Sequence, residues 1–389
     1  MPSKINELEP LLPITDATKL SFENDPENNA ESRKRSHITN LIETNQITLE
    51  ECRAIARSEY GLVSDELRKI LWPILVEVDA SNTELPQQID DLKLHSEYNQ
   101  VVLDVNRSLK RFPPGIPYEQ RIALQDQLTV LIMRVINKYP ELRYYQGYHD
   151  VAITFLLVVG EKVSFAVMEK LSTSHFKECM HETMDPTQRR LMFIYPIINN
   201  ENPILYNFLK KSSVGTLFAL PWVLTWFGHS LKSYKCVVRL YDFFLASPMY
   251  FSIYVTAAIV LHRAHEILKE DCDMASIHCL LSQLPDETPF EELLKNACIL
   301  YEKYPLSKIE KDVDIMIRNE LEERQRDVER STAARKKLLE DRRYKKTLPN
   351  NILPTFLLKK SFIVTTTFSI LFGICAYYYK NQYWSSSVS

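Results

Sequence analysis

Glycine is scarce in this chain, with 7 residues among 389, which is about 2% where soluble proteins usually have about 7%. Parallel sheets, tight hairpins and phosphate-binding loops depend on glycine, because it adopts positive φ without steric cost and lets another backbone approach closely. Proline, which interrupts helices only locally, is present at its ordinary level with 20 residues. A long chain with so few glycines is therefore predicted to be an all-α protein.

Apolar residues recur at helical spacing through the middle of the chain. In QDQLTVLIMRVINKY (125–139), one stripe at three- and four-residue spacing is formed by Leu128, Leu131, Ile132, Val135 and Ile136. Pro140 restricts the residue before it, so this helix is expected to end near Lys138 or Tyr139. The segment VAITFLLVVG (151–160) is apolar on all sides, as in a helix at the centre of a large bundle. These patterns predict one large helical domain.

Composition divides the chain into segments of different character. Residues 1–35 are rich in Pro, Asn, Glu and Asp and are expected to form a disordered tail. Residues 36–305 carry the helical domain. Residues 306–350 are expected to form a mostly charged helix or stalk, which lacks the sustained apolar seam of a coiled coil. The segment 361–379 is predicted to span a membrane, and 380–389 to be a short luminal tail.

The predicted membrane span, SFIVTTTFSILFGICAYYY (361–379), is free of charged residues and is bracketed by Lys359, Lys360 and Lys380. As a helix it measures about 28 Å, close to the hydrocarbon thickness of about 30 Å. The alternative is a buried helix of the globular domain, but the segment follows a charged stalk with no core beside it. Basic residues upstream predict that the N-terminal side faces the cytosol, and the short span fits the thin endoplasmic reticulum bilayer. We expect a tail-anchored protein of the endoplasmic reticulum membrane.

Charge and motifs exclude several classes of function. The net charge of -3 does not favour a nucleic-acid partner, because phosphate recognition needs a basic surface. The 7 cysteines are scattered without a CxxC pair, so neither a disulfide framework nor a zinc ribbon is expected. The patterns GxxxxGK[ST], GxGxxG, GxSxG and HExxH are missing from the sequence. We therefore expect no metal, no nucleotide or other cofactor, and no hydrolase activity of the chain's own.

Two polar stretches of the sequence are candidates for a functional site. In VVLDVNR, Asp104 and Arg107 are one helical turn apart, so the carboxylate can hold the guanidinium in one orientation. Taken alone, they could equally be a surface ion pair that contributes about a few tenths of a kcal/mol. Gln146, in RYYQGYHD, could likewise be a loop amide bonded to nearby backbone. One of the scarce glycines, Gly147, follows it directly.

These stretches belong to a set of motifs that occurs in a fixed order. VVLDVNR resembles the [IV]xxDxxR motif of the TBC (Tre-2/Bub2/Cdc16) domain, and YYQGYHD resembles its YxQGxxD motif. GLVSDELRKILWPIL resembles the opening LRxxxW motif, with Arg68 and Trp72. RLYDFFL, which contains Asp242, resembles the later RxWDxxF element but has Tyr241 where tryptophan is usual. Four motifs in the right order make this chain similar to a TBC domain over roughly residues 60–250.

The resemblance implies a GTPase-activating protein that acts on a Rab GTPase. It implies that Arg107 enters the partner's active site and stabilises the charge of the transition state, with Asp104 aiming the guanidinium. It also implies that Gln146 holds the attacking water, a role usually taken by the GTPase's own glutamine. GTP and Mg²⁺ then belong to the partner. A C-terminal anchor is unusual in this family and points to its branch in the endoplasmic reticulum, and so to a Rab of the early secretory pathway.

The remaining residues of the YxQGxxD motif are expected to support Gln146. Gly147 permits a sharp turn or a positive φ and allows the partner's backbone to come close. Asp150 is expected in the first turn of the following helix, where a carboxylate favours the helix dipole and can cap loop amides. Tyr144 is expected to anchor the loop in the core. These residues are thus predicted to position the site rather than to take part in the chemistry.

Two alternatives stay open at this point. Arg68, Trp72 and Asp242 either hold the fold or contribute to partner binding. The chain could also be a non-catalytic, membrane-anchored Rab-binding scaffold, or an anchored helical adaptor that shares only the fold of the family. The presence of both Arg107 and Gln146 favours the activator.

Overall fold

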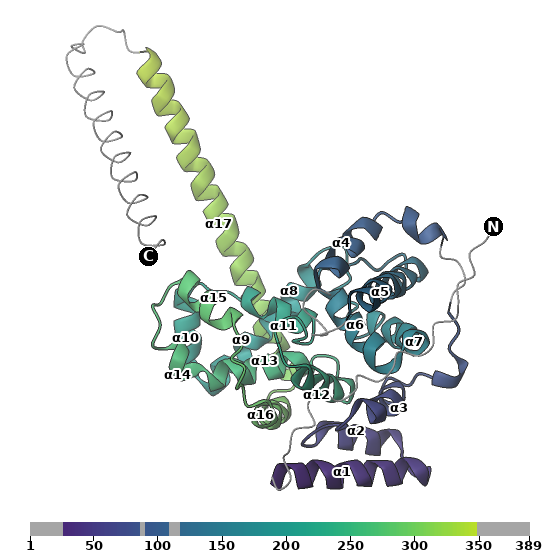
Figure 1. Cartoon of the computed structure of the whole chain (residues 1–389). Helices are drawn as coiled ribbons and strands as arrows, with labels where there is room; N and C mark the ends of the chain where they lie inside the picture. Colours follow the sequence, from purple (N-terminus) through teal and green to yellow (C-terminus); the bar gives the residue numbers. More distant parts are fainter. Residues whose placement is uncertain (1–25, 86–89, 109–116, 348–389) are drawn as a thin grey trace, which may run out of the picture. The chain divides into compact units, whose positions relative to one another are not determined.

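The computed structural model describes residues 26–85, 90–108 and 117–347, and the regular elements in these ranges are all helices (Figure 1). This confirms the all-α class for the described part of the chain. The α-helices are α1 (Pro26–Glu43), α2 (Leu49–Arg57), α3 (Asp65–Leu75), α4 (Tyr98–Ser108), α5 (Tyr118–Lys138), α6 (Tyr148–Val159), α7 (Glu161–Ser172), α8 (Asp185–Met192), α9 (Ile194–Glu201), α10 (Pro203–Ser212), α11 (Leu220–Leu224), α12 (Tyr234–Leu245), α13 (Phe251–His262), α14 (Ala264–Ile267), α15 (Met274–Ser282), α16 (Phe290–Lys303) and α17 (Leu306–Thr347). The 3-10 helices are η1 (Ala80–Asn82), η2 (Asp90–Leu94) and η3 (Leu217–Ala219).

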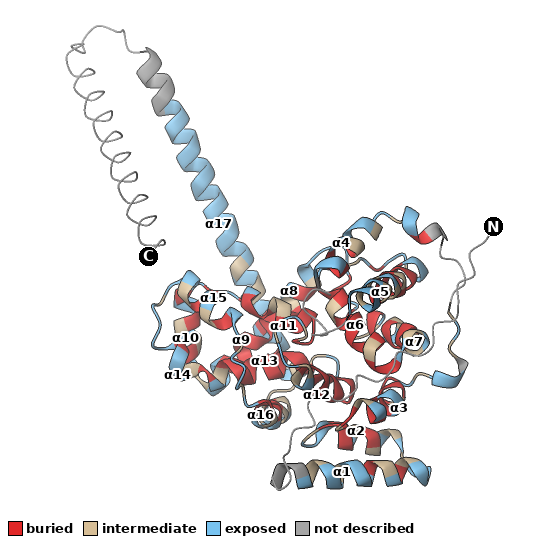
Figure 2. Ribbon diagram, viewed as in Figure 1, coloured by how far each residue is buried: buried red, intermediate tan, exposed pale blue. Residues whose placement is uncertain are grey.

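Helices α6 and α13 lie at the centre of the helical domain. Every residue of α13 from Phe251 to Val260 is buried, and α6 is buried from Val151 onward except at Leu157 (Figure 2). Helix α13 packs against α9 and α16, and α6 packs against α3, α5 and α7. Surrounded helices have no polar face, which is why both sequences are apolar on all sides. The prediction of a central helix at 151–160 is confirmed.

Helix α5 ends at Lys138, as the proline rule predicts. Its buried face is wider than the apolar stripe suggests, because Thr129, Met133 and Arg134 are also buried. The Arg134 guanidinium donates through Nη1 to the Glu161 carboxylate of α7 at 2.8 Å. Such a broad buried face fixes α5 firmly, and the loop that leaves it carries Gln146.

The predicted disordered tail, residues 1–35, is too long, because α1 already begins at Pro26. The Lys34 ammonium donates a hydrogen bond of 3.0 Å to the carbonyl oxygen of Ile55 near the end of α2, and Ile38 is completely buried. A helix C-terminus attracts a cation, so Lys34 and the buried Ile38 together help to fix a segment whose composition is otherwise polar. Residues 1–25 lie outside the described residues.

The beginning of α17 belongs to the helical domain rather than to a separate stalk. Ile309 and Val313 are buried, and the Arg189 guanidinium lies 2.8 Å from the Asp314 carboxylate. The chain divides into compact units after Arg318, well inside α17 and not where the helix begins. The predicted boundary between domain and stalk is therefore wrong by several turns, since a few apolar residues are enough to dock the start of a charged helix.

The second unit contains the rest of α17. All its side chains from Leu321 to Glu340 are exposed, as expected for a solvated charged helix (Figure 2). The predicted membrane span 361–379 and the tail 380–389 lie outside the described residues. Among the helices that the structure describes, none combines the length and the apolar character needed to cross a bilayer.

Arg68, Trp72 and Asp242 form a buried cluster that joins α3 to α12. The fully buried Asp242 carboxylate accepts hydrogen bonds from Arg68 Nε at 3.0 Å, from Trp72 Nε1 at 2.7 Å and from the backbone N–H of Leu62 at 2.9 Å. Gly61 has φ +55°, and a Cβ there would lie 2.4 Å from Asp242 Oδ2. A buried carboxylate needs such pairing, and these interior side chains do not reach a partner. Of the two roles left open by the sequence, this burial favours a part in holding the fold.

Candidate functional site

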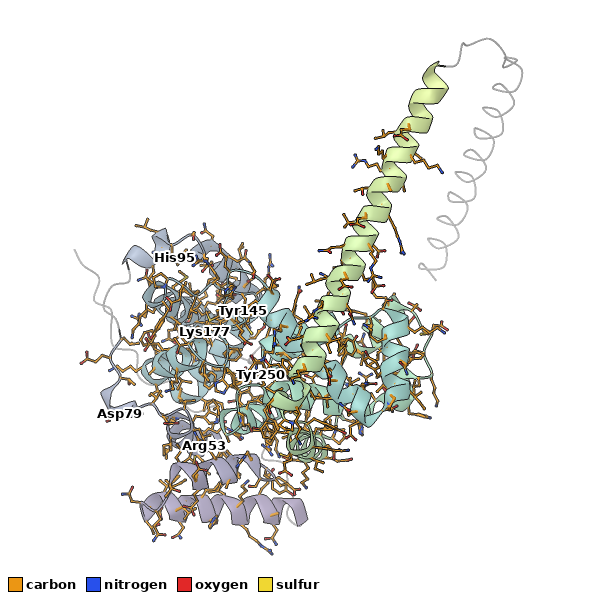
Figure 3. All side chains as sticks on the ribbon, turned by 180° about the vertical axis from the view of Figure 1, so that it is seen from behind. Arg53, Asp79, His95, Tyr145, Lys177 and Tyr250 are labelled. Carbon is orange, nitrogen blue, oxygen red and sulfur yellow. The ribbon has the colours of Figure 1, made fainter. Side chains whose placement is uncertain are left out.

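The loop between α5 and α6 presents Gln146 to solvent. Gln146 is exposed, whereas Tyr145 and Gly147 on either side are buried. The hydroxyl of Tyr145, a residue labelled in Figure 3, donates to the carbonyl oxygen of Leu224 at 2.8 Å. This bond fixes the loop from inside. Gly147 has φ +109°, so the predicted turn with positive φ is confirmed.

The space beside Gly147 is filled by the chain itself. A Cβ at this position would lie 2.8 Å from the Cγ2 atom of Thr225. The carbonyl oxygen of Thr225 accepts a hydrogen bond of 3.2 Å from the hydroxyl of Tyr241, which is completely buried. Glycine is therefore required by packing within the domain. The tyrosine that replaces the usual tryptophan of the motif is an interior residue and leaves the exposed surface unchanged.

Helix α4 carries the acidic and basic pair. Asp104 is only 1% exposed, while the Arg107 side chain is 69% exposed and lies 3.8 Å from Asp104 Oδ1. This oxygen makes no hydrogen bond within the described chain, and the ion pair with Arg107 is the interaction that the structure gives it there. A buried carboxylate beneath an exposed guanidinium restrains the cation without removing it from the surface.

Tyr144 connects this helix to the loop of Gln146. Its hydroxyl lies 3.2 Å from Asp104 Oδ2, an oxygen that also accepts a hydrogen bond of 3.0 Å from Gln100. Its backbone N–H donates to the Glu97 carboxylate at 3.2 Å. Burial, reinforced by the Asp104 carboxylate, raises the pKa of Tyr144 far above its usual value, so the hydroxyl keeps its proton.

These contacts bring the two predicted catalytic side chains to the same region. Gln146 is two residues from Tyr144, and Arg107 is one helical turn from Asp104. The hydrogen bond between Tyr144 and Asp104 therefore joins the loop that carries Gln146 to the helix that carries Arg107. Tyr144 packs against the apolar core, as predicted, and its hydroxyl also bonds to the buried Asp104 carboxylate. Both side chains stay accessible to a partner.

Asp150 occupies the first turn of α6, as expected, but it caps no loop amide within the described part of the chain. Its Oδ2 atom lies 2.9 Å from Nδ1 of His229 and 3.6 Å from Nε2 of His149. On its other side, His149 Nδ1 lies 2.8 Å from the Tyr144 hydroxyl. Burial lowers the pKa of His149 below its usual value of 6.5, although the Asp150 and Asp104 carboxylates oppose this. A continuous polar network thus runs from His229 to Asp104.

Sequence reasoning missed the histidines and Glu97. His149 stands at a variable position of YxQGxxD, and His229 is 79 residues away from its partner Asp150. Glu97 is 47 residues from Tyr144. No spacing rule connects such positions. The one available signal is the presence of a histidine between the motif's tyrosine and its acid.

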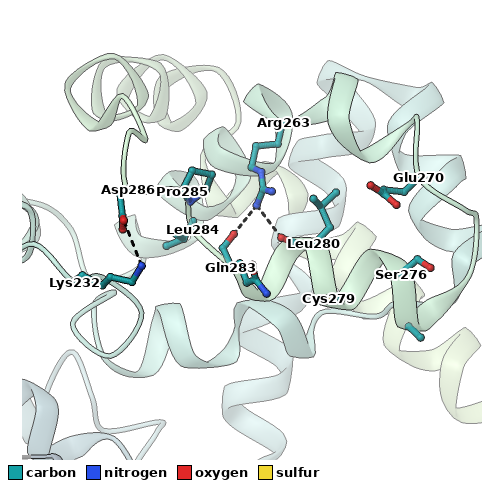
Figure 4. A pocket seen from close by; sticks show the side chains of 11 residues that line it. Lys232, Arg263, Glu270, Ser276, Cys279, Leu280, Gln283, Leu284, Pro285 and Asp286 are labelled. Atoms are coloured by element: carbon teal, nitrogen blue, oxygen red, sulfur yellow. Dashed lines mark hydrogen bonds and ion pairs between the residues drawn. The ribbon is translucent and has the colours of Figure 1, made fainter. Parts of the chain in front are cut away.

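Three hollows of the described surface are lined by residues other than Arg107 and Gln146. The one in Figure 4, of about 740 Å³, is lined by eleven residues, among them Lys232, Arg263 and Asp286. Two others, of about 620 and 420 Å³, are lined by neither Arg107 nor Gln146. An exposed cation and an amide outside these hollows suit a macromolecular partner better than an enclosed small molecule.

Comparison with known proteins identifies the family. The Rab-GTPase-TBC domain model matches residues 65–268. The chain is 46% identical over 285 residues to TBC1 domain family member 20 of Mus musculus, covering 73% of this chain and 71% of that protein. It is 31% identical over 262 residues to the GTPase-activating protein gyp10 of Schizosaccharomyces pombe, covering 66% and 70% of the two chains.

Solved structures share the fold. The Ypt/Rab-GAP domain of Gyp1p superposes with a TM-score of 0.59 at 18% identity, covering 70% of this chain and 99% of that domain. The flagellar RabGAP TBC domain of Chlamydomonas gives 0.51 at 13% identity, covering 73% and 99%. At such identities the likeness concerns the fold, while the matching family model and the closer sequences identify the relationship. The chain belongs to the TBC-domain family of Rab GTPase-activating proteins.

Proposed function

We propose that this chain accelerates GTP hydrolysis by supplying Arg107 and Gln146 to the active site of a Rab GTPase. Hydrolysis spreads negative charge over the transferred phosphoryl group and the leaving oxygen, and a guanidinium donates two hydrogen bonds while adding positive charge. The Gln146 amide has both a donor and an acceptor, and so can hold the attacking water and a backbone group together. GTP and Mg²⁺ are bound by the Rab.

The observation that carries this proposal is the contact of 3.2 Å between Tyr144 and Asp104. It joins the loop of Gln146 to the helix of Arg107, two segments whose catalytic residues are far apart in sequence. Both side chains are exposed above buried supports. Preorganised groups of this kind are effective because they need little rearrangement when the transition state forms.

A panel of purified, GTP-loaded Rabs tests the proposal. We expect the chain to accelerate single-turnover phosphate release from at least one Rab of the early secretory pathway by a factor of about 10³ or more. A non-catalytic scaffold would bind a Rab without changing its rate of hydrolysis. Binding without acceleration across the panel would therefore favour the scaffold and contradict the activator.

We further propose that the segment 361–379 anchors the chain in the endoplasmic reticulum membrane with the helical domain in the cytosol. The segment has the length of a membrane span and basic residues on its N-terminal side. Anchoring would confine the activator to the surface that carries its lipidated partner and raise the frequency of encounter.

Deletion of residues 361–389 provides the test of the anchor. The truncated chain is expected to move from the membrane pellet to the supernatant after cell fractionation, while its rate enhancement on a soluble Rab is unchanged. Deletion of the tail 380–389 alone is the matched control and should leave the chain in the pellet. A truncated chain that still resists extraction by alkaline carbonate would contradict the anchor.

A further inference from the structure

The Tyr144 hydroxyl has one proton and two acceptors. His149 Nδ1 lies 2.8 Å from the hydroxyl oxygen, and Asp104 Oδ2 lies 3.2 Å from it. The proton can be donated to only one of them at a time, unless the imidazole carries its own proton on Nδ1 and donates to the tyrosine oxygen. The protonation of His149 therefore determines whether Tyr144 is available to Asp104.

The neighbour of the other ring nitrogen determines the neutral tautomer. His149 Nε2 faces the Asp150 carboxylate at 3.6 Å, and a negative oxygen favours the tautomer with its proton on Nε2. Nδ1 is then the acceptor and draws the tyrosine proton away from Asp104. When the ring gains a second proton, Nδ1 becomes a donor, and the tyrosine proton turns to Asp104 Oδ2.

The groups around His149 come from several elements. Asp104 lies on α4, Tyr144 in the loop before α6, Asp150 on α6 itself, and His229 beyond α11. Burial lowers the pKa of His149, and the positive charge of a protonated His229 acts in the same direction, whereas both carboxylates raise it. Because burial lowers the pKa of His149 below 6.5, the neutral ring predominates at neutral pH, and the ring gains its second proton only on acidification.

We propose that His149 is a positioning residue for Arg107, acting through Tyr144 on the Asp104 carboxylate. Neutral His149 accepts the hydrogen bond from the Tyr144 hydroxyl and leaves Asp104 Oδ2 with Gln100 as its donor among the described residues, so the carboxylate is held less firmly beneath Arg107. Protonated His149 donates to the tyrosine oxygen, so the Tyr144 hydroxyl donates to Asp104 and fixes the carboxylate. This inference rests on the proposed role of Arg107, and it makes the activator stronger at acidic pH.

The tautomer can be measured without any GTPase. The free protein, labelled with ¹⁵N in its histidines, gives imidazole nitrogen shifts that distinguish the two tautomers and the charged ring, and the spectrum of His149→Leu identifies the signals of His149. We expect the proton on Nε2 at neutral pH and a charged ring once the pH falls below the lowered pKa of His149. A neutral ring with its proton on Nδ1 would overturn the proposal, whatever the catalytic result.

Kinetics supply the second test. For the wild-type chain, the ratio of stimulated to intrinsic phosphate release at saturating activator is expected to rise about three- to tenfold as the pH falls from about 8 through the range in which the nitrogen shifts show His149 gaining its proton. The KM for the Rab should change little. In His149→Leu the tyrosine keeps Asp104 as its acceptor, so the ratio should stay at the high acidic value throughout. His265→Leu, at an exposed histidine of α14, should retain the wild-type profile.

The Tyr144→Phe variant distinguishes positioning from mere packing. It lacks the hydroxyl that both acceptors share, so its rate should be low at every pH and its acidic rise absent. A His149→Leu chain that behaves like Tyr144→Phe, or that keeps the wild-type acidic rise, would contradict the proposal. If the wild-type chain stimulates no Rab at any pH, the function proposed above fails, while the tautomer measurement still decides the inference.

Discussion

Replacing Arg107 by alanine is expected to lower the stimulated rate of single-turnover GTP hydrolysis by about 10³–10⁵-fold, which corresponds to about 4–7 kcal/mol of transition-state stabilisation. The side chain is 69% exposed, so its removal leaves the core intact. The loss should appear in the rate at saturating activator and much less in Rab affinity, because the guanidinium bonds most strongly to the charge of the transition state.

Two further variants separate charge from geometry. Arg107→Lys keeps the positive charge but loses the planar fork, so it should recover only a small part of the lost rate. Arg33→Ala removes an exposed arginine of α1 and serves as the matched control with an unchanged rate. If a folded Arg107→Ala chain still stimulates GTP hydrolysis at nearly the wild-type rate, Arg107 has no part in the mechanism. A non-catalytic Rab-binding scaffold would then be the better interpretation of the site.

Local rules predict much of the fold. The scarcity of glycine indicates the all-α class, and the stripe that begins at Leu128 together with Pro140 predicts the end of α5 at Lys138. Such features depend on neighbours within a few residues. The start of helix α1 could not be predicted in this way. Its contacts, such as that of Lys34 with Ile55, join two helices and cannot be inferred from local composition.

The site shows the same division between local and long-range contacts. The pairing of Asp104 with Arg107 is a matter of helical spacing and could be predicted. The contact between Tyr144 and Asp104 spans 40 residues, and the contact between Asp150 and His229 spans 79. The motifs of a family mark which residues matter at such distances, but only the folded chain shows which of them touch.

Burial also separates residues that a motif treats alike. Trp72 and Asp242 are completely buried and bonded to each other, whereas Gln146 and Arg107 are exposed. Sequence alone assigns all of them to a TBC domain. The structure divides them into residues that make the fold and residues that can reach another protein.

Replacing Gln146 by alanine is expected to lower the stimulated rate by about 10²–10³-fold, the usual effect of losing one preorganised polar contact at a reacting centre. Gln146 makes no hydrogen bond to the described part of its own chain, and its loop is fixed by Tyr145 and Tyr144. The variant should therefore fold as the wild type does and bind the Rab with similar affinity. Single-turnover phosphate release and thermal unfolding together check these expectations.

A second replacement at Gln146 tests whether the N–H donor of its amide is needed. Gln146→Glu keeps the shape but offers no N–H donor and adds a negative charge beside the phosphates, so it should be at least as defective as alanine. Gln188→Ala, at an exposed glutamine of α8, is the matched control. If Gln146→Ala and Gln146→Glu both keep the full rate, the water must be held by the Rab's own residues. In that case Arg107 would act alone, and the loop would serve only for docking.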